Sequence, residues 1–234
     1  MGRLQKVRTN LLPALAAALT VLLAVWLLLA PAESRLGSLV KLVYVHGALV
    51  WTGLLAFSLA GLFGLVALVV RHLLRWEARA GKWYRGTQAA GLAALLIWVV
   101  YAISAVLVTG LTWGQWIAWN EPRVRVTAMI LFAALALTIV ARLVDHRDFT
   151  AGANLLLGVA PWIAVTAAEA IRHPVNPIGG SGSSAIQLYY LLIQLTVLGL
   201  GLSLVAWLWT GAELQSRQMD TVSGGSETEV IDGR

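Results

Sequence analysis

Residues 42–70 read LVYVHGALVWTGLLAFSLAGLFGLVALVV, a run without a single Asp, Glu, Lys or Arg. A helix needs about 20 mainly apolar residues to cross the hydrocarbon core of a membrane, and this run exceeds that length. It does not fit a spanning strand, because its residues are continuously apolar instead of alternating with polar ones. The stretch therefore predicts a transmembrane helix.

Five further apolar stretches lie along the chain, each set off by charged residues, Gly or Pro. The chain is 59% hydrophobic and 12% charged, with a mean hydropathy of +0.79, whereas soluble domains are roughly 45–50% apolar and ~25% charged. The first stretch follows basic residues, as a secretory signal does, but it is about twice as long as a signal core. We predict an all-α integral membrane protein with six transmembrane helices, over residues 11–30, 42–70, 87–111, 126–144, 151–171 and 185–211.

Basic residues predict how these helices are oriented, because Lys and Arg favour the cytoplasmic side. Five of the 17 fall on one side, at Arg35, Lys41, Arg123, Arg125 and Arg172, which leaves 12 for the termini and the even-numbered loops. Both termini are therefore predicted to be cytoplasmic, and a short Trp-rich loop between the third and fourth helices is predicted to face outward. The net charge of +6 follows from this topology and implies no nucleic-acid partner.

Residues 1–217 are predicted to form one transmembrane domain, and the polar stretch 218–234 (QMDTVSGGSETEVIDGR) a disordered cytoplasmic tail. The chain has no Cys, which excludes disulfides and covalent attachment of a prosthetic group through a CxxCH site. It also lacks the GxxxxGK[ST] pattern that cradles phosphates, so any dependence on ATP must come from another chain.

Tryptophans gather in one predicted outward segment, residues 109–127 (TGLTWGQWIAWNEPRVRVT). A single Trp at a helix end is usually an interfacial anchor. Three within seven residues, at Trp113, Trp116 and Trp119, instead indicate a broad apolar surface, and their spacing predicts one side of a short helical segment. Such a surface suits a flat aromatic ligand.

Two of the four histidines, His46 and His173, are predicted at the same outward depth on different helices. His72 and His146 fall in cytoplasmic basic loops, where solvated side chains are expected. Two imidazoles can supply both axial ligands of a haem iron, or two ligands of copper or zinc. Zinc usually needs three or four protein ligands, so the pair favours haem.

Haem also needs cations for its propionates, and the candidates on this side double as ordinary contacts to lipid phosphate. Glu169, four residues before His173, is either a partner that orients that imidazole or a solvated acid at the helix end. The candidate cations are Lys41, Arg123, Arg125 and Arg172.

At these residues the sequence resembles the haem-handling membrane proteins with a tryptophan-rich external loop, and among them the cytochrome c maturation protein C family (CcmC). That family's loop reads approximately TG…WGxWWxWDxRLTS. Asn120 stands here in place of its Asp, and Glu121-Pro122 adds one residue before the Arg. The matching positions are Thr109-Gly110, Trp113-Gly114, Trp116, Trp119, Arg123 and Thr127 in the loop, together with His46, Trp51 and His173 for the flanking histidine motifs.

The resemblance implies that this chain binds haem b non-covalently at the outer face of the cytoplasmic membrane and passes it to a haem chaperone. It further implies that the chain works with an ABC-type ATPase and a second membrane subunit, and that it is not itself an enzyme. Two alternatives remain open on the sequence. One is a membrane b-type cytochrome or electron carrier, and the other is a small-solute permease with an interfacial Trp belt.

Overall fold

The computed structural model describes the backbone of residues 3–172, 178 and 180–231, and the side chains of residues 11–172, 178 and 180–214. Six helices, one of them extended by the π-helix η1, are long and apolar enough to cross a membrane. The prediction of an all-α protein with six transmembrane helices is confirmed. The elements are α1 (Arg3–Leu29), α2 (Val40–Leu68), η1 (Val69–Leu73), α3 (Glu77–Trp113), α4 (Pro122–Val144), α5 (Arg147–Ala167) and α6 (Ser184–Ile231).

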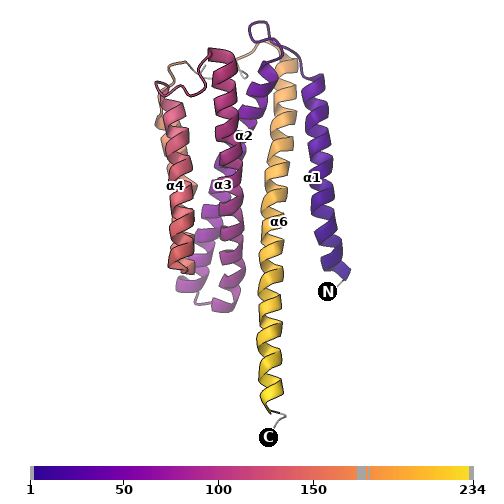
Figure 1. Cartoon of the computed structure of the whole chain (residues 1–234), viewed down its shortest axis with the longest axis vertical. Helices are drawn as coiled ribbons and strands as arrows, with labels where there is room; N and C mark the ends of the chain where they lie inside the picture. Colours follow the sequence, from indigo (N-terminus) through magenta and orange to yellow (C-terminus); the bar gives the residue numbers. More distant parts are fainter. Residues whose placement is uncertain (1–2, 173–177, 179, 232–234) are drawn as a thin grey trace.

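The helices run side by side, and both chain termini lie at the same end of the bundle (Figure 1). We call this the terminal end, which the charge pattern predicts to be cytoplasmic, and the opposite one the outward end. The connections from α1 to α2, from α3 to α4 and from α5 to α6 all lie at the outward end. The Trp-rich segment is therefore an outward-end loop between α3 and α4.

Helix α2 packs against α3, α5 and α6, whereas α1 packs on α6. The approach of α2 to α5 is very close. A Cβ added to Gly61 would lie 3.0 Å from the Gly158 Cα, and one added to Gly64 would lie 2.5 Å from the Ala151 carbonyl oxygen. Small residues let helix backbones pack closely in membranes, where burial of apolar surface contributes little to association. This crossing therefore depends on the absence of side chains.

Asn154 is a polar residue buried among the helices. Its Nδ2 donates to the Thr87 carbonyl at 3.0 Å and to Thr87 Oγ1 at 3.1 Å, and Thr87 Oγ1 donates to the Ala60 carbonyl at 2.7 Å. A polar group within a membrane is costly unless it is paired. Asn154 therefore ties α5 to α3 and α2.

At the terminal end, the Asp148 carboxylate joins three elements. It accepts a hydrogen bond from Arg71 Nη1 at 3.2 Å and one from the Tyr84 hydroxyl, and it lies 3.0 Å from His72 Nε2. His72 was expected to be a solvated loop residue. Its side chain is indeed well exposed, but it is held by this carboxylate together with Arg71 of η1.

Several helix ends differ from the sequence prediction, and three of these differences have a clear physical reason. Helix α3 begins at Glu77 and not at Thr87, because hydropathy detects only the apolar part of a helix. Its first turns carry cations that lie over neighbouring indoles, Arg79 over Trp76 and Lys82 over Trp83, each at 4.8 Å from the ring centroid. Helix α5 ends at Ala167 and not at residue 171, since Ala168 adopts an extended conformation with ψ of 118°.

The third difference concerns the C-terminal stretch. Helix α6 continues to Ile231 through the segment for which the sequence predicted a disordered tail. A helix that is already formed adds one hydrogen bond for each residue it fixes and needs no new nucleus. The division of the chain at residues 217 and 218 stays a prediction.

The connection between α1 and α2 carries a tight turn that is closed by backbone hydrogen bonds between Glu33 and Gly37. The pKa of Glu33 is lowered because its carboxylate accepts hydrogen bonds from the Leu36 backbone N–H, the Ser34 hydroxyl and the Arg35 backbone N–H. A carboxyl whose folded-state pKa is lowered stabilises the fold above its unfolded pKa and loses that contribution as the pH falls. We therefore expect the Leu36 amide to be less protected from hydrogen exchange at pH values below about 4.3 than at pH 7. If Glu33→Gln and the native protein protect this amide equally at pH 7, the Glu33 carboxylate does not hold the turn.

Candidate functional site

Helix α3 stops within the Trp-rich motif because Gly114 adopts a left-handed conformation with φ of +69°. Its N–H donates to the Gly110 carbonyl at 3.1 Å, and the Gln115 N–H donates to the Thr109 carbonyl at 3.3 Å. Glycine favours this conformation because it has no Cβ. Trp113 is therefore the last helical residue, and the predicted short helix through the three tryptophans is wrong.

Thr109 and Gly110 hold the start of the loop against α3. Thr109 Oγ1 donates to the Trp116 carbonyl at 2.9 Å. A Cβ on Gly110 would lie only 2.3 Å from the Trp116 ring, so the indole rests directly on the glycine backbone. The TG pair of the motif thus has a structural task, since Thr fastens the loop backbone and Gly makes room for the ring.

The loop presents its aromatic side chains to the surroundings. Trp116 is 58% exposed and Trp119 is 56% exposed, whereas Ala118 between them is buried. Trp113 is half-buried, and Gly114, Asn120 and Arg125 are exposed. Below them Trp51 of α2 contacts Trp162 of α5, with 5.7 Å between ring centroids. The outward end therefore carries apolar aromatic surface that a ligand can reach.

His46 projects from α2 onto α3. Its ring stacks on Tyr101 with centroids 4.9 Å apart, and Nδ1 lies 3.0 Å from Ser104 Oγ. Because the Ser104 hydroxyl donates to the Tyr101 carbonyl at 2.7 Å, its oxygen is the acceptor toward the imidazole. A neutral imidazole in this arrangement carries its proton on Nδ1, so Ser104 orients the ring as a hydrogen-bond acceptor.

Tyr101 extends this contact to α4. Its hydroxyl lies 3.3 Å from Thr127 Oγ1, and Thr127 Oγ1 donates to the Arg123 carbonyl at 2.9 Å. Thr127 is the residue matched to the closing Thr of the loop motif. Its hydroxyl lies between Tyr101 of α3 and the first turn of α4, so this Thr helps to hold the two helices together. The buried Arg123 Nε has no hydrogen-bond partner among the described residues. This guanidinium nitrogen is suited to an anionic group of a ligand.

Glu121 is the residue of this end that the sequence prediction undervalued. Its side chain is only 1% exposed, and its two carboxylate oxygens accept the backbone N–H groups of Ile171 at 3.2 Å and Arg172 at 2.8 Å. Arg172 in turn donates from Nη1 to Gln115 Oε1 at 3.0 Å. The Trp loop is thereby fastened at two points to the segment that leads into His173.

His173 lies outside the described residues, so its predicted pairing with His46 stays a prediction. Glu169, proposed to orient it from the same helical side, lies beyond the end of α5 and is exposed. That helical relation is wrong, because the backbone after Ala167 leaves the helix and turns its N–H groups to Glu121.

The structure does not bring His46 and Trp116 into one contact. His46 lies against Ser104, whereas Trp116 packs on Gly110, six residues further along α3. At 3.6 residues per turn and ~1.5 Å per residue, the two contact points are roughly 120° apart around α3 and about 9 Å apart along it. A ligand that touches both must bridge the end of α3.

Among the described residues, no group of three or more His, Cys, Asp or Glu side chains can hold a metal ion. The donor chemistry present fits haem as a cargo. The imidazole of His46, two exposed indoles and the guanidinium of Arg123 all lie toward the outward end.

No protein-family model matches the chain. The chain is similar to heme exporter protein C of Bradyrhizobium diazoefficiens, with 27% identity over 210 residues that cover 84% of this chain and 74% of that protein. The similarity extends well beyond the Trp loop into the rest of the chain. The resemblance indicated by the loop and the histidines is therefore confirmed as a similarity to heme exporter protein C.

Proposed function

We propose that this chain binds haem at the outer face of the cytoplasmic membrane and passes it to a haem chaperone for the biogenesis of c-type cytochromes. Its relative's name, heme exporter protein C, supports a role in haem transport. The environment of His46 carries the proposal. The Ser104 hydroxyl accepts a hydrogen bond from His46 Nδ1 and so orients this imidazole near the end of the bundle that carries exposed indoles, where Nε2 would be the nitrogen that ligates an iron.

In this proposal haem is the cargo, and the chain's own residues bind and orient it without making or breaking a bond. His46 and His173 supply axial nitrogen ligands. Arg123 and Arg125 pair with the propionates, for which a planar guanidinium is well suited. The loop tryptophans supply the apolar platform, while Gly114 and Asn120 set the path of the loop. The platform residues are Trp51, Trp113, Trp116 and Trp119.

The partners follow from what the chain lacks and what it resembles. It has no phosphate-binding motif, so an ABC-type ATPase with a second membrane subunit would supply the energy for release. A haem chaperone would accept the cargo at the outward end. The bilayer is the surrounding solvent of all six helices.

The two alternatives have less support. A b-type cytochrome often carries a second pair of histidines across the membrane, but here His72 is held by Asp148. A permease would need polar groups that are available within the membrane. The side-chain amide of Asn154 is instead hydrogen-bonded to Thr87.

A visible absorption spectrum of the detergent-purified chain from haem-replete cells tests the proposal. We expect a Soret band in the native protein and its loss or shift in His46→Ala. We expect Ser104→Ala to keep the band but to weaken haem retention by about 10-fold to 100-fold, the usual effect of losing a group that orients a metal ligand.

His146→Ala serves as the matched control, because this exposed histidine lies at the terminal end. Its spectrum should equal that of the native protein. A colourless native protein, or an unaltered Soret band in His46→Ala, would refute haem binding at this site and favour the permease alternative.

A further inference from the structure

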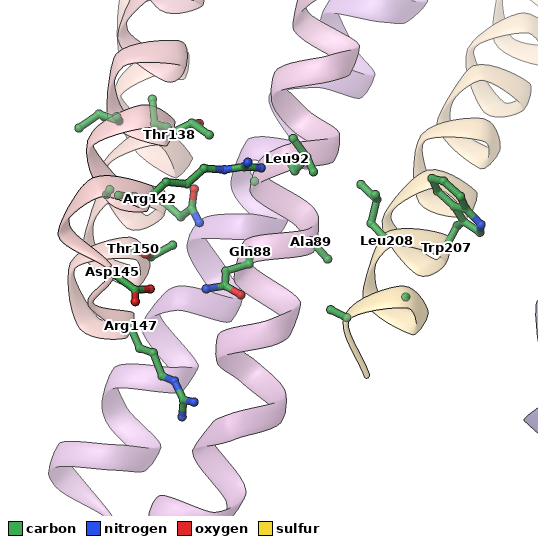
Figure 2. Close-up of a pocket in the computed structure, with 18 of the residues that line it drawn as sticks. Gln88, Ala89, Leu92, Thr138, Arg142, Asp145, Arg147, Thr150, Trp207 and Leu208 are labelled. Carbon is green, nitrogen blue, oxygen red and sulfur yellow. The ribbon is translucent and has the colours of Figure 1, made fainter. Parts of the chain in front are cut away.

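A cavity of about 610 Å³ lies at the terminal end, at the far end of the bundle from the candidate haem site. Figure 2 shows most of the side chains that line it, and the lining comes from α1, α3, α4, α5, α6 and the connection between α4 and α5. Ligand pockets commonly have volumes of roughly 300–1,000 Å³, so this one can hold a sizeable group. None of the residues assigned to haem lines it.

The lining changes character along the bundle axis. Near the end of the bundle it is polar, with Thr150 on α5 and Arg142 on α4, and deeper in it is mainly aliphatic, with Leu137 and Leu157 beside Thr138 and Asn154. Residue 157 lies seven positions beyond Thr150 on α5. At 1.5 Å per residue the polar rim and the mainly apolar depth are therefore about 10 Å apart. This gradient matches a lipid whose head lies at the terminal end.

The charge of the cavity is set by four titratable residues from α4 and the start of α5, namely Arg142, Asp145, His146 and Arg147. The linings from α3 and α6 are uncharged. In Figure 2 the Arg142 side chain extends across the cavity toward Leu92, whereas Arg147 points away from it toward the end of the bundle. With His neutral, the two Arg and one Asp leave a net charge of +1.

No hydrogen bond or salt bridge involves the Arg142 side chain within the part of the chain that the structure describes. Arg142 lies in the last turn of α4 and its side chain is exposed, so its guanidinium can reach an anionic partner. Phosphate is the partner that its planar fork binds best. The cytoplasmic leaflet is rich in anionic lipids, and basic pockets between helices on that side bind their head groups.

We propose that this cavity binds one acidic phospholipid of the cytoplasmic leaflet. The phosphate lies at Arg142, with Thr150 and Gln88 beside it, and the first carbons of an acyl chain lie against Leu137 and Leu157. The site depends on the predicted orientation of the bundle and is independent of haem binding at the other end.

Native mass spectrometry of the full chain in detergent tests this, with phosphatidylglycerol and phosphatidylcholine of the same chain length added in equal amounts. We expect the native protein to retain phosphatidylglycerol preferentially. Arg142→Gln should lower that retention about fivefold, which corresponds to ~1 kcal/mol for one cation near a lipid head group. Arg142→Lys keeps the charge and should keep most of the binding, which separates loss of the site from misfolding.

Arg75→Gln is the matched control. It removes one cation from the same end of the bundle, in the connection between η1 and α3, and Arg75 does not line the cavity. Its lipid retention should equal that of the native protein. Equal retention of both lipids, or an equal loss in Arg75→Gln, would show only general surface attraction and overturn the proposal. The lipid proposal would also be overturned if Arg142→Gln lowered the haem absorbance and no phospholipid were found bound.

Discussion

Glu121→Gln is expected to loosen the outward end and to lower haem retention, although it changes none of the residues proposed to contact haem. The buried carboxylate accepts two backbone N–H groups, and an amide can accept with its oxygen only, so its NH₂ would face one N–H donor. Hydrogen bonds to a charged group are worth about 1.5–3 kcal/mol each. Losing one should lower the thermal midpoint by about 3–12 °C for a chain of this size.

The most direct measurement is hydrogen exchange of the Ile171 and Arg172 amides, which should speed up in Glu121→Gln relative to the native protein. Glu169→Gln provides a matched control, because this acid belongs to the same segment but is exposed. It should change neither the exchange rates nor the thermal midpoint. Unaltered amide exchange in Glu121→Gln would show that the carboxylate does not hold this segment.

Gly64→Val is expected to separate α2 from α5. A Cβ at this position would lie 2.5 Å from the Ala151 carbonyl oxygen and 3.3 Å from Thr87 Oγ1. The backbone oxygen cannot move aside without shifting α5, and overpacking of this kind costs about 1–3 kcal/mol or more. The shift would also strain the Thr87–Asn154 hydrogen bonds. Thermal unfolding in one detergent should show a midpoint lower by at least several degrees.

Gly152→Ala tests the opposite case on the facing helix. A Cβ there meets nothing within 4 Å, and Ala favours a helix interior over Gly by up to about 1 kcal/mol. This variant should be as stable as the native protein or slightly more so. If Gly64→Val and Gly152→Ala unfold at the same temperature, the close crossing of α2 and α5 does not limit stability.

The sequence was sufficient for the membrane class and the number of helices, because the length of the hydrocarbon core imposes a minimum apolar run that residues 42–70 and their counterparts satisfy. It also placed the Trp loop at the connection between α3 and α4, and Gly114 marks the end of α3 through its own backbone preference. It misplaced the ends of α3 and α5, since hydropathy does not detect interfacial helical turns or a backbone diverted to a distant carboxylate.

What the tertiary structure alone decided are contacts between residues far apart in the chain. Ser104 fixes the His46 tautomer across 58 positions, and Glu121 binds Arg172 across 51. Neither pair has a local pattern, because each depends on how two helices rotate against each other. The same holds for the faces of α3, where six residues separate Ser104, which contacts His46, from Gly110, on which Trp116 packs. Local composition therefore determined the membrane fold, whereas helix packing determined which side chains meet at its outward end.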